Sequence, residues 1–263
     1  MKPFQTFPDS YKNDIQFVLT DIDDTLTTNG RLLAAVFFSI ERLKKANIRI
    51  IPITGRPAGW CDHIARMWQI DGLVGENGAF YFVYDELQKK MIRRYWKTKQ
   101  ERTKDRKRLE TIKEKILRRV SGCRVASDQR YREADLAIDF CEDVKPLPME
   151  AVRQIERCFI EAGAQAKISS IHVNGWFGDY DKLSMTRRLF EEIFAEDSNG
   201  IREKSLFIGD SPNDAPMFAY FPHSVGVANI RHFEKKMPHL PTWITKQKGG
   251  LGFAEMVSVL LAP

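Results

Sequence analysis

The stretch that decides the fold is FVLTDIDDTLT, residues 17–27, in which an apolar run ends in three carboxylates. This pattern predicts a buried strand whose carboxyl end opens into a loop, and in open α/β sheets ligands bind at that end. Asp21 and Asp23 stand two apart, so an extended backbone points both carboxylates to one side. There they repel each other unless a cation or a proton intervenes. The pattern indicates a metal-dependent site in which one Asp is the nucleophile and the other the acid and base. An acidic turn that caps the next helix is the alternative.

Two later segments supply groups that bind phosphate. Ile50–Pro57, with the sequence IIPITGRP, predicts a second buried strand that ends in Thr54 and Gly55. A Thr hydroxyl and nearby backbone N–H groups form a cradle for phosphate oxygens. Lys182 precedes a helix predicted over 183–195 and offers a compact cation for phosphoryl charge.

A third apolar strand, within SLFIGDSPND at 205–214, ends in further oxygen ligands. These are Asp210, Asn213 and Asp214. Carboxylate and amide oxygens suit magnesium, so the sequence predicts Mg²⁺ as the cofactor.

In this order the segments resemble the four motifs of the haloacid dehalogenase superfamily. The matching elements are Asp21-x-Asp23-x-Thr25, Thr54-Gly55-Arg56-Pro57, Lys182 and Gly209-Asp210-x-x-Asn213-Asp214. Two details depart from the family pattern. Asp24 stands where the family often has Gly, and Leu183-Ser184-Met185 follows Lys182 in place of the usual Gly-x-Ala. Neither departure removes a chemical group.

The chain also resembles subfamily IIB, which includes Cof-type, mannosyl-3-phosphoglycerate phosphatase-like and sucrose-phosphatase-like enzymes. Gly75-Glu76-Asn77-Gly78 resembles its entrance turn, and an insertion separates the second and third motifs. Strands alternate with helices over 15–84, which predicts a parallel sheet. We expect the α/β class, with a Rossmann-like core at 1–84 and 172–263 and an inserted α+β cap domain at 85–171.

The resemblance implies a magnesium-dependent phosphatase. Asp21 attacks phosphorus to form an aspartyl-phosphate, and Asp23 protonates the leaving oxygen and then takes a proton from water. Phosphate oxygens are held by Thr54, Gly55 and Lys182. The metal is held by Asp21, Asp23 through its carbonyl, Asp210 and Asp214, and Asn213 supports the fourth loop.

A sugar phosphate or glycosyl-glycerate phosphate is the expected substrate, and six residues of the cap and entrance are its candidate contacts. These are Arg56, Asn77, Arg132, Glu133, His172 and Asn174. Arg132-Glu133 is equally compatible with a surface ion pair. His172 fits either an acid or base or, better, a polar contact at the cap hinge.

Two other functions stay open. A phosphomutase of the same superfamily uses both Asp21 and Asp23. A non-catalytic protein that binds a phosphorylated ligand or RNA is the second alternative, although no carboxylate of the motifs is missing. The presence of Asp23 argues against dehalogenase chemistry, which needs no acid at that position.

The net charge of +6 is concentrated in one stretch. Arg93–Arg119 holds 13 Lys or Arg against four acids. Leu109, Ile112 and Ile116 recur there at helical spacing, which predicts a solvated helix. Aromatic residues that would stack on single-stranded nucleic acid are missing after Trp96. We therefore expect no nucleic-acid partner, only a mild attraction of anionic substrates.

No apolar run approaches the length of a membrane span. Residues 1–13 lack the cationic start and apolar stretch of a signal peptide. We therefore expect a cytoplasmic protein without membrane contact, whose partner is a small phosphate ester. The four cysteines show no paired spacing, which predicts neither a disulfide framework nor a zinc site. The sequence carries no sign of the oligomeric state.

Overall fold

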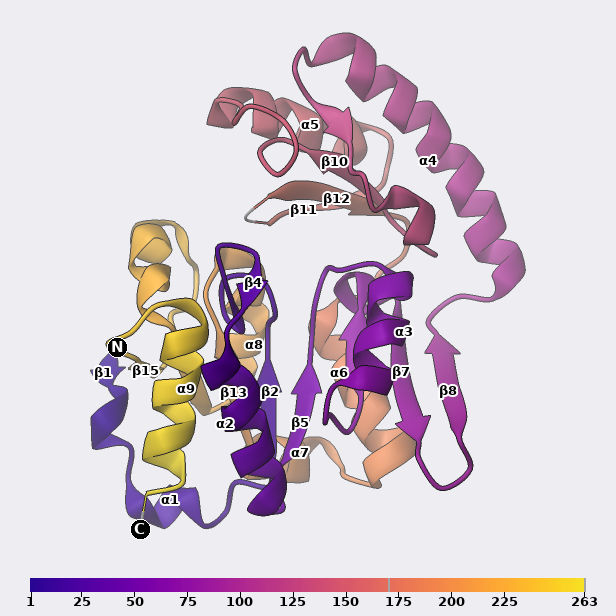
Figure 1. Cartoon of the computed structure of the whole chain (residues 1–263). Helices are drawn as coiled ribbons and strands as arrows, with labels where there is room; N and C mark the ends of the chain where they lie inside the picture. The colour runs from indigo at the N-terminus through magenta and orange to yellow at the C-terminus, as the bar shows by residue number, and fades with distance from the viewer. Residues whose placement is uncertain (170, 263) are drawn as a thin grey trace.

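The structure, a computed structural model, describes residues 1–169 and 171–262. Its main sheet has six parallel strands and lies in the lower part of the molecule in Figure 1. In sheet order the strands are β1 (Lys2–Pro3), β15 (Trp243–Ile244), β14 (His223–Gly226), β13 (Ser205–Gly209), β2 (Phe17–Thr20) and β5 (Arg49–Pro52). The predicted α/β class is confirmed. Because β2 and β13 are neighbours, the two strands that end in carboxylates end side by side.

Helices cover both faces of the main sheet. One apolar cluster receives residues from α2 (Ala34–Lys45), α3 (Ala58–Met67) and α9 (Gly249–Leu260). The other receives residues from α6 (Lys182–Leu189), α7 (Ser198–Lys204) and α8 (Ala215–Tyr220). Within β2, Val18 packs into the first cluster, while Phe17 and Leu19 pack into the second. Alternate side chains of a strand point to opposite faces, so this short, fully buried strand serves both clusters.

A second, three-stranded sheet extends the main sheet beside β5. It consists of β6 (Leu73–Gly75), β7 (Phe80–Asp85) and β8 (Lys90–Tyr95), paired antiparallel. A parallel bridge between Ile53 and Val74 joins it to the end of β5. The strand β8 lies inside the stretch that the sequence analysis assigned to the cap, but it pairs with β7, which continues the core.

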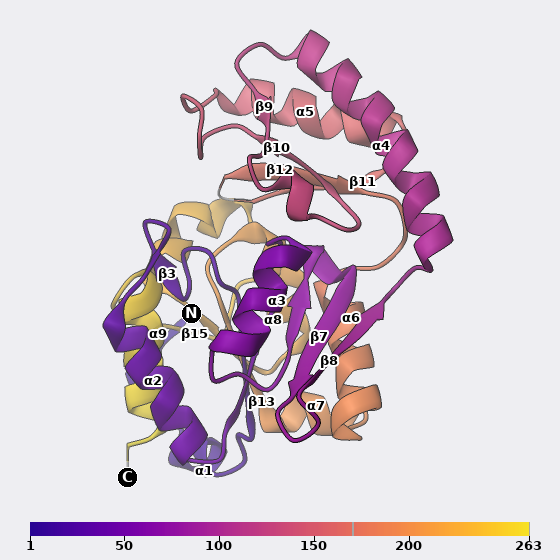
Figure 2. The same cartoon turned by 45° about the vertical axis from the view of Figure 1, so that its right-hand side comes forward.

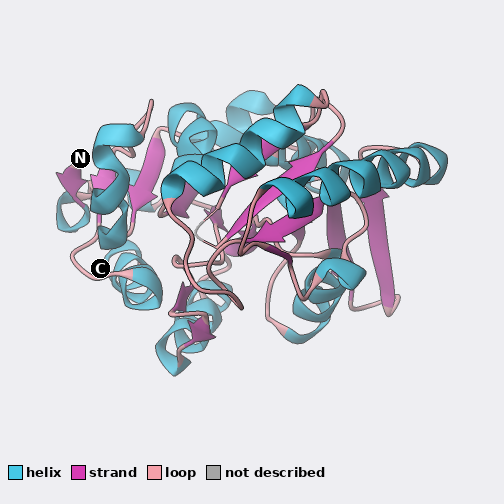
Figure 3. Cartoon of the chain, turned by 90° about the horizontal axis from the view of Figure 1, so that it is seen from above, coloured by secondary structure: helices cyan, strands magenta, loops and turns pink. Residues whose placement is uncertain are grey.

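A smaller four-stranded sheet lies above the main sheet (Figures 1 and 2). Its antiparallel order is β11 (Gln165–Ile168), β12 (His172–Trp176), β10 (Leu136–Asp139) and β9 (Arg124–Val125). The helices α4 (Lys99–Arg119) and α5 (Met149–Glu161) lie over the strands when the molecule is seen from above (Figure 3) and share one apolar cluster with them. We call this stretch, from α4 to β12, the cap unit.

The division into two domains stays a prediction. The strand pairings, however, move the two positions at which the chain passes from the core to the cap and back. The chain was expected to return to the core at His172. That expectation is wrong, because β12 pairs along its length with β10 and β11 of the smaller sheet. The return follows Trp176, ahead of the helix α6.

Several short elements connect these layers. A hairpin of β3 (Thr27–Thr28) and β4 (Arg31–Leu32) follows the first motif and was not predicted; we call residues 27–32 the flap. The short helical pieces are η1 (Phe4–Thr6), α1 (Asp9–Lys12), η2 (Glu76–Gly78), η3 (Gln129–Tyr131), η4 (Phe190–Phe194), η5 (Pro212–Asp214) and η6 (Ala228–Lys236). In the part of the chain that the structure describes, no helix combines the length and apolar character needed to cross a membrane.

Candidate active site

Three carboxylates meet at the carboxyl ends of β2 and β13. Asp21 follows β2 directly, Asp210 follows β13 directly, and Asp214 closes the short helix η5. One oxygen from each lies within 4.8 Å of the others, and all three residues are buried. The backbone N–H of Asp21 donates to the carbonyl of Ile208 at 3.0 Å. The pairing of the two strands therefore continues into the site and fixes the spacing of the carboxylates.

Lys182, the first residue of α6, reaches into this cluster. Its Nζ lies 2.6 Å from Asp21 Oδ1 and 2.8 Å from Asp214 Oδ1. A capping box fixes the first turn of the helix, since the Asp181 side chain accepts from the Ser184 backbone N–H and the Ser184 hydroxyl oxygen accepts from the Asp181 backbone N–H. The lysine is only 5% exposed. Its two carboxylate partners raise its pKa against the effect of burial.

The cluster holds more negative than positive charge. Burial raises the pKa of Asp21 to about 8, with repulsion from Asp214 and Asp23 adding to it, and the Lys182 ammonium opposes the rise. Burial and the neighbouring carboxylates also raise the pKa of Asp210 well above its usual value. One ammonium does not balance three buried carboxylates, so a further cation would favour their ionised forms. Closely spaced carboxylate oxygens are the donor set that Mg²⁺ takes, and the residues fit this ion.

Neighbouring groups orient two of these carboxylates. Asn229 donates from Nδ2 to Asp210 Oδ2 at 3.2 Å, and the Thr25 hydroxyl donates to Asp210 Oδ1 at 3.3 Å. The second oxygen of Asp214 accepts from the backbone N–H of Asp210 at 3.2 Å. A Cβ at Gly209 would lie 2.6 Å from that oxygen. The glycine of the fourth motif therefore leaves room for the Asp214 carboxylate.

Asn213 lies in the same loop. Its Oδ1 accepts a hydrogen bond from the Ser211 hydroxyl at 2.6 Å. The backbone N–H of Asp214 donates to the Ser211 carbonyl at 3.0 Å, which closes the turn. These contacts agree with a supporting role for Asn213 in the fourth loop.

The loop after β5 brings Thr54 and Gly55 to the same edge of the sheet. Thr54 is fully buried, and its hydroxyl accepts from the backbone N–H of Arg56 at 3.0 Å. Asn77 packs behind this loop: its backbone N–H donates to the Thr54 carbonyl at 3.1 Å. A Cβ on Gly55 would lie 3.2 Å from the amide atoms of Asn77. Asn77 therefore supports the loop of Thr54 and Gly55 from the side.

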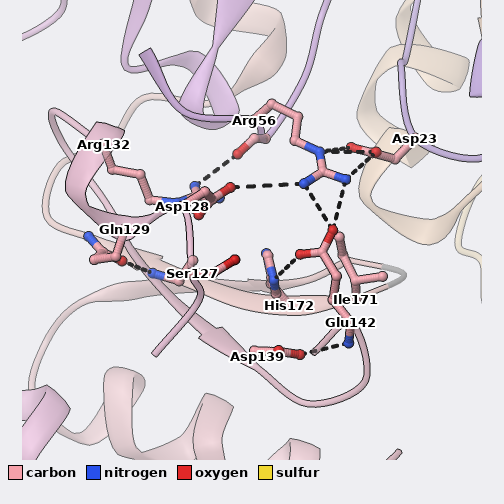
Figure 4. Close-up of polar contacts among 12 residues, drawn as sticks. Asp23, Arg56, Ser127, Asp128, Gln129, Arg132, Asp139, Glu142, Ile171 and His172 are labelled. Carbon is pink, nitrogen blue, oxygen red and sulfur yellow. Dashed lines mark hydrogen bonds and ion pairs between the residues drawn. The ribbon is translucent and has the colours of Figure 1, made fainter. Parts of the chain in front are cut away.

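Arg56 joins carboxylates from the core and the cap unit. It donates from Nε and Nη2 to the Asp23 carboxylate at 2.8–3.1 Å. Its Nη1 donates to Glu142 Oε1 at 3.2 Å and lies 3.9 Å from Asp128. Figure 4 shows the guanidinium between Asp23 on one side and these two cap residues on the other. One side chain thus ties the predicted acid–base residue to the cap unit.

His172 begins β12 and contacts the same glutamate. Its Nε2 lies 2.9 Å from Glu142 Oε2. The close contact with His172 and the charge of Arg56 lower the pKa of Glu142 to about 2. The sequence analysis missed Glu142 as well as Asp128. A signal for Glu142 was available, because carboxylates follow the predicted strand at 134–140 in the same way as they follow the strand before Asp21.

Arg132 lies at the interface between the two layers and is 5% exposed. It donates to Asp128 at 2.9 and 3.0 Å and to Asp135 at 3.0 Å. It also donates to the carbonyl of Gly55 at 3.0 Å. Asn174 donates to the other oxygen of Asp135 at 2.9 Å. The alternative of a surface ion pair is wrong for Arg132, which belongs to a buried network that contacts the loop of Thr54 and Gly55.

Glu133 points away from this network. Its carboxylate lies 3.7 Å from Arg102 and 3.9 Å from Arg106. Its backbone N–H donates to the carboxylate of Glu76 at 2.8 Å, and that carboxylate also accepts from the N–H of Ala134 at 2.6 Å. Glu76, which the sequence analysis did not select, is fully buried. It forms a second core-to-cap contact.

Most of the predicted site residues surround one narrow cavity of about 20 Å³, which has room for about one water molecule. The lining includes Asp21, Asp23, Gly55, Arg56, Arg132, His172, Asn174, Asp210 and Asn213. Three other predicted residues contact the lining without being part of it. The Thr54 hydroxyl accepts from the Arg56 N–H, Lys182 donates to Asp21, and the Asp214 carboxylate accepts from the Asp210 N–H. Asn77 and Glu133 are not among the described residues that line the cavity.

Comparisons with known proteins agree with this geometry. Residues 18–121 match the family model of the haloacid dehalogenase-like hydrolases. A phosphoglycolate phosphatase of Methanothrix thermoacetophila is 25% identical over 251 residues, covering 94% of this chain and 98% of that protein.

Two solved structures share the fold. The crystal structure of Thermoplasma acidophilum 0175 has a TM-score of 0.69 and 20% identity, with 94% of this chain and 98% of that chain covered. The sucrose-phosphatase from Synechocystis sp., solved with sucrose and phosphate, has a TM-score of 0.65 and 15% identity, with 94% of this chain and 100% of that chain covered.

Proposed function

Because the chain is a haloacid dehalogenase-like hydrolase of the phosphatase type, we propose that it hydrolyses a small phosphate monoester through an aspartyl-phosphate on Asp21. A sugar phosphate or a glycosyl-glycerate phosphate is the proposed substrate class. One observation carries the proposal: Lys182 contacts both Asp21 and Asp214 beside Asp210, at the sheet edge where the Thr54 loop also ends. Phosphoryl transfer depends chiefly on positioning and charge stabilisation, and these groups supply both.

Asp21 acts as the nucleophile. Lys182 holds its Oδ1 at 2.6 Å, and Asp21 lines the narrow cavity, which leaves Oδ2 as the attacking oxygen. A bond forms from that oxygen to phosphorus while the bond from phosphorus to the ester oxygen breaks in line. Water then attacks the phosphorus of the acyl phosphate, which releases inorganic phosphate and restores the Asp21 carboxylate.

Asp23 moves the protons. It gives a proton to the departing ester oxygen and later takes one from the attacking water. In the structure both of its oxygens accept hydrogen bonds from Arg56. Arg56 therefore has to release at least one oxygen of Asp23 before a proton passes to the leaving group. Thr54, Gly55 and Lys182 hold the remaining phosphate oxygens.

Asp21, Asp210 and Asp214, with the main-chain carbonyl of Asp23, are the residues that would hold Mg²⁺. Bound there, the ion would neutralise the carboxylates and the charge that develops on the phosphate oxygens. The raised pKa values of Asp21 and Asp210 support this assignment, because they report carboxylates in need of positive charge.

The proposal is tested by measuring phosphate release from a panel of esters, with magnesium or with EDTA. The panel contains sugar phosphates, glycosyl-glycerate phosphates, phosphoglycolate and p-nitrophenyl phosphate. We expect magnesium-dependent release that is lost in Asp21→Asn. Transfer of the phosphoryl group back to the substrate, without free phosphate, would identify a mutase. Absence of turnover together with absence of magnesium binding would identify a non-catalytic protein.

A further inference from the structure

A second, larger cavity adjoins the narrow one. It measures about 500 Å³, and Asp23 and Arg56 line both cavities. The narrow cavity is much the smaller of the two, so the larger one offers the room for the alcohol half of a substrate. The leaving oxygen of the ester has to lie within hydrogen-bond reach of Asp23. Beyond Asp23, the larger cavity is the space that can hold the rest of the leaving group.

The larger cavity lies between the flap, α3 and η3 of the cap unit. Figure 1 shows the flap strand β4 above the end of β2 and the helix α3 beyond β5, with the cap unit above them. Its walls are mainly apolar and aromatic, and they include Leu32, Trp60, Ile64, Trp68 and Tyr131. Such lining, with a few polar groups at one end, is typical of small-molecule sites of this size.

Two aromatic rings in these walls are open to solvent. Trp60 and Tyr131 are each 45% exposed. The Arg56 guanidinium lies 4.6 Å from the centroid of the Trp60 ring. A Cβ at Gly59 would lie 2.9 Å from the Cβ of Tyr131. The absence of a side chain at Gly59 therefore lets Tyr131 of the cap unit pack close to α3 and complete the wall.

The charges of the cavity disfavour a small acidic leaving group. Arg56 is the single Lys or Arg among the described residues that line it. Asp23, Glu142 and Asp128 already surround this guanidinium. Apart from the imidazole of His63, no other described lining residue offers a positive charge to a carboxylate such as that of glycolate.

We propose that this aromatic cavity is the leaving-group subsite, and that it takes a pyranose ring whose flat C–H face packs on Trp60 and Tyr131. This inference rests on the proposed function and narrows its substrate class to esters in which a sugar ring lies close to the phosphate. The partial positive charge of C–H groups matches the negative face of an aromatic ring. The Arg56–Asp23 ion pair forms the boundary that the phosphate passes on its way to Asp21.

The test compares wild type, Trp60→Ala, Trp60→Phe and Phe38→Ala on hexose 6-phosphates and on phosphoglycolate. Phe38 is 60% exposed on α2 and is not among the residues that line the cavity, so it is the matched control. We expect wild type to prefer the hexose esters. We expect Trp60→Ala to lower kcat/KM for them by about tenfold or more, mainly through KM, and to change phosphoglycolate hydrolysis much less. We expect Trp60→Phe, which keeps a flat ring, to retain most of the activity on the hexose esters. We expect Phe38→Ala to leave the hydrolysis of both substrates unchanged.

Two results would overturn the inference: a wild-type preference for phosphoglycolate, or an equal loss on both substrates in Trp60→Ala. If no ester is hydrolysed, the proposed function fails, and binding still decides this subsite. Calorimetric titration of a hexose 6-phosphate into Asp21→Asn protein with magnesium is then compared with the Asp21→Asn, Trp60→Ala double variant. An affinity about tenfold weaker in the double variant supports the subsite. Equal affinities, or no binding to either, count against it.

Discussion

Arg56 holds the carboxylate of Asp23 from the side that faces the cap unit, with a closest nitrogen-to-oxygen distance of 2.8 Å. The same guanidinium donates to Glu142 at 3.2 Å. The proposed acid–base group and the cap unit therefore share one cation. A displacement of the cap unit changes the surroundings of Asp23 directly, through an Arg56 contact whose cap partner, Glu142, lies outside the four motifs.

Glu142→Gln should reduce the acid sensitivity of the fold. The pKa of Glu142 is lowered in the folded protein to about 2 from an ordinary value of 4.5. A lowered pKa means that the stabilisation is present above about pH 4.5 and is lost as the pH falls through the folded value. Partial exposure limits the contribution to about 1–2 kcal/mol. Urea unfolding at pH 6 and pH 3 measures it.

We expect wild type to lose more stability than Glu142→Gln between these two pH values. Glu150→Gln, at an exposed position on α5, is the control and should follow wild type. Parallel losses in all three proteins would contradict this role of Glu142.

Lys182→Met should destabilise the protein and abolish activity. It removes the one ammonium between Asp21 and Asp214 and leaves buried carboxylates without their partner. Loss of one member of a buried ion pair costs about 3–5 kcal/mol. Magnesium should recover part of this loss, because it supplies positive charge to the same carboxylates. Thermal unfolding with magnesium and with EDTA measures both effects, and an unchanged melting temperature would argue against the charge balance described here.

Magnesium should stabilise the wild-type protein but not Asp210→Ala. An ion that binds only the folded state at 100 times its Kd adds about 2.7 kcal/mol. Asp210 is one of the three clustered carboxylates, and its removal takes a ligand away. Asp9→Asn, an exposed position in the first turn of α1 outside the carboxylate cluster, is the matched control and should keep the full stabilisation. Equal shifts of Tm in Asp210→Ala and wild type would place the ion elsewhere.

Gly78→Ala should disturb the position of Lys182. Gly78 has φ +106°, and a Cβ there would lie 2.0 Å from the Asp181 carbonyl oxygen, immediately before Lys182. We expect a loss of about 3 kcal/mol or more, since both the backbone and the start of α6 must move.

Gly163→Ala is the control for Gly78→Ala. Gly163 has φ +74°, but a Cβ there would meet nothing within 4 Å. It should cost only the left-handed backbone strain, about 1–2 kcal/mol, and leave phosphate release unchanged. Similar stability and activity in the two variants would show that the contact with Asp181 is unimportant.

The sequence alone determined the α/β class, which the main sheet confirms, and the family resemblance, which the match of residues 18–121 to the family model supports. The reason is that the signal lies within a short stretch of the sequence. A four-residue apolar strand such as β2 needs no distant information to be recognised, and Asp21 follows it directly. Parallel strands in a shared sheet then bring Asp21 and Asp210 together, so their proximity could be predicted from strand ends. Their roles in catalysis stay predictions.

The tertiary structure alone decided how the cap unit meets the core. Arg56 and Glu142 are 86 residues apart, and Glu76 and Ala134 are 58 apart. These contacts depend on where loops lie once the cap unit packs on the core, and loop positions leave no periodic pattern in the sequence. The same holds for β12, whose strand pattern is compatible with either sheet. Only its hydrogen bonds to β10 and β11 assign it to the cap unit.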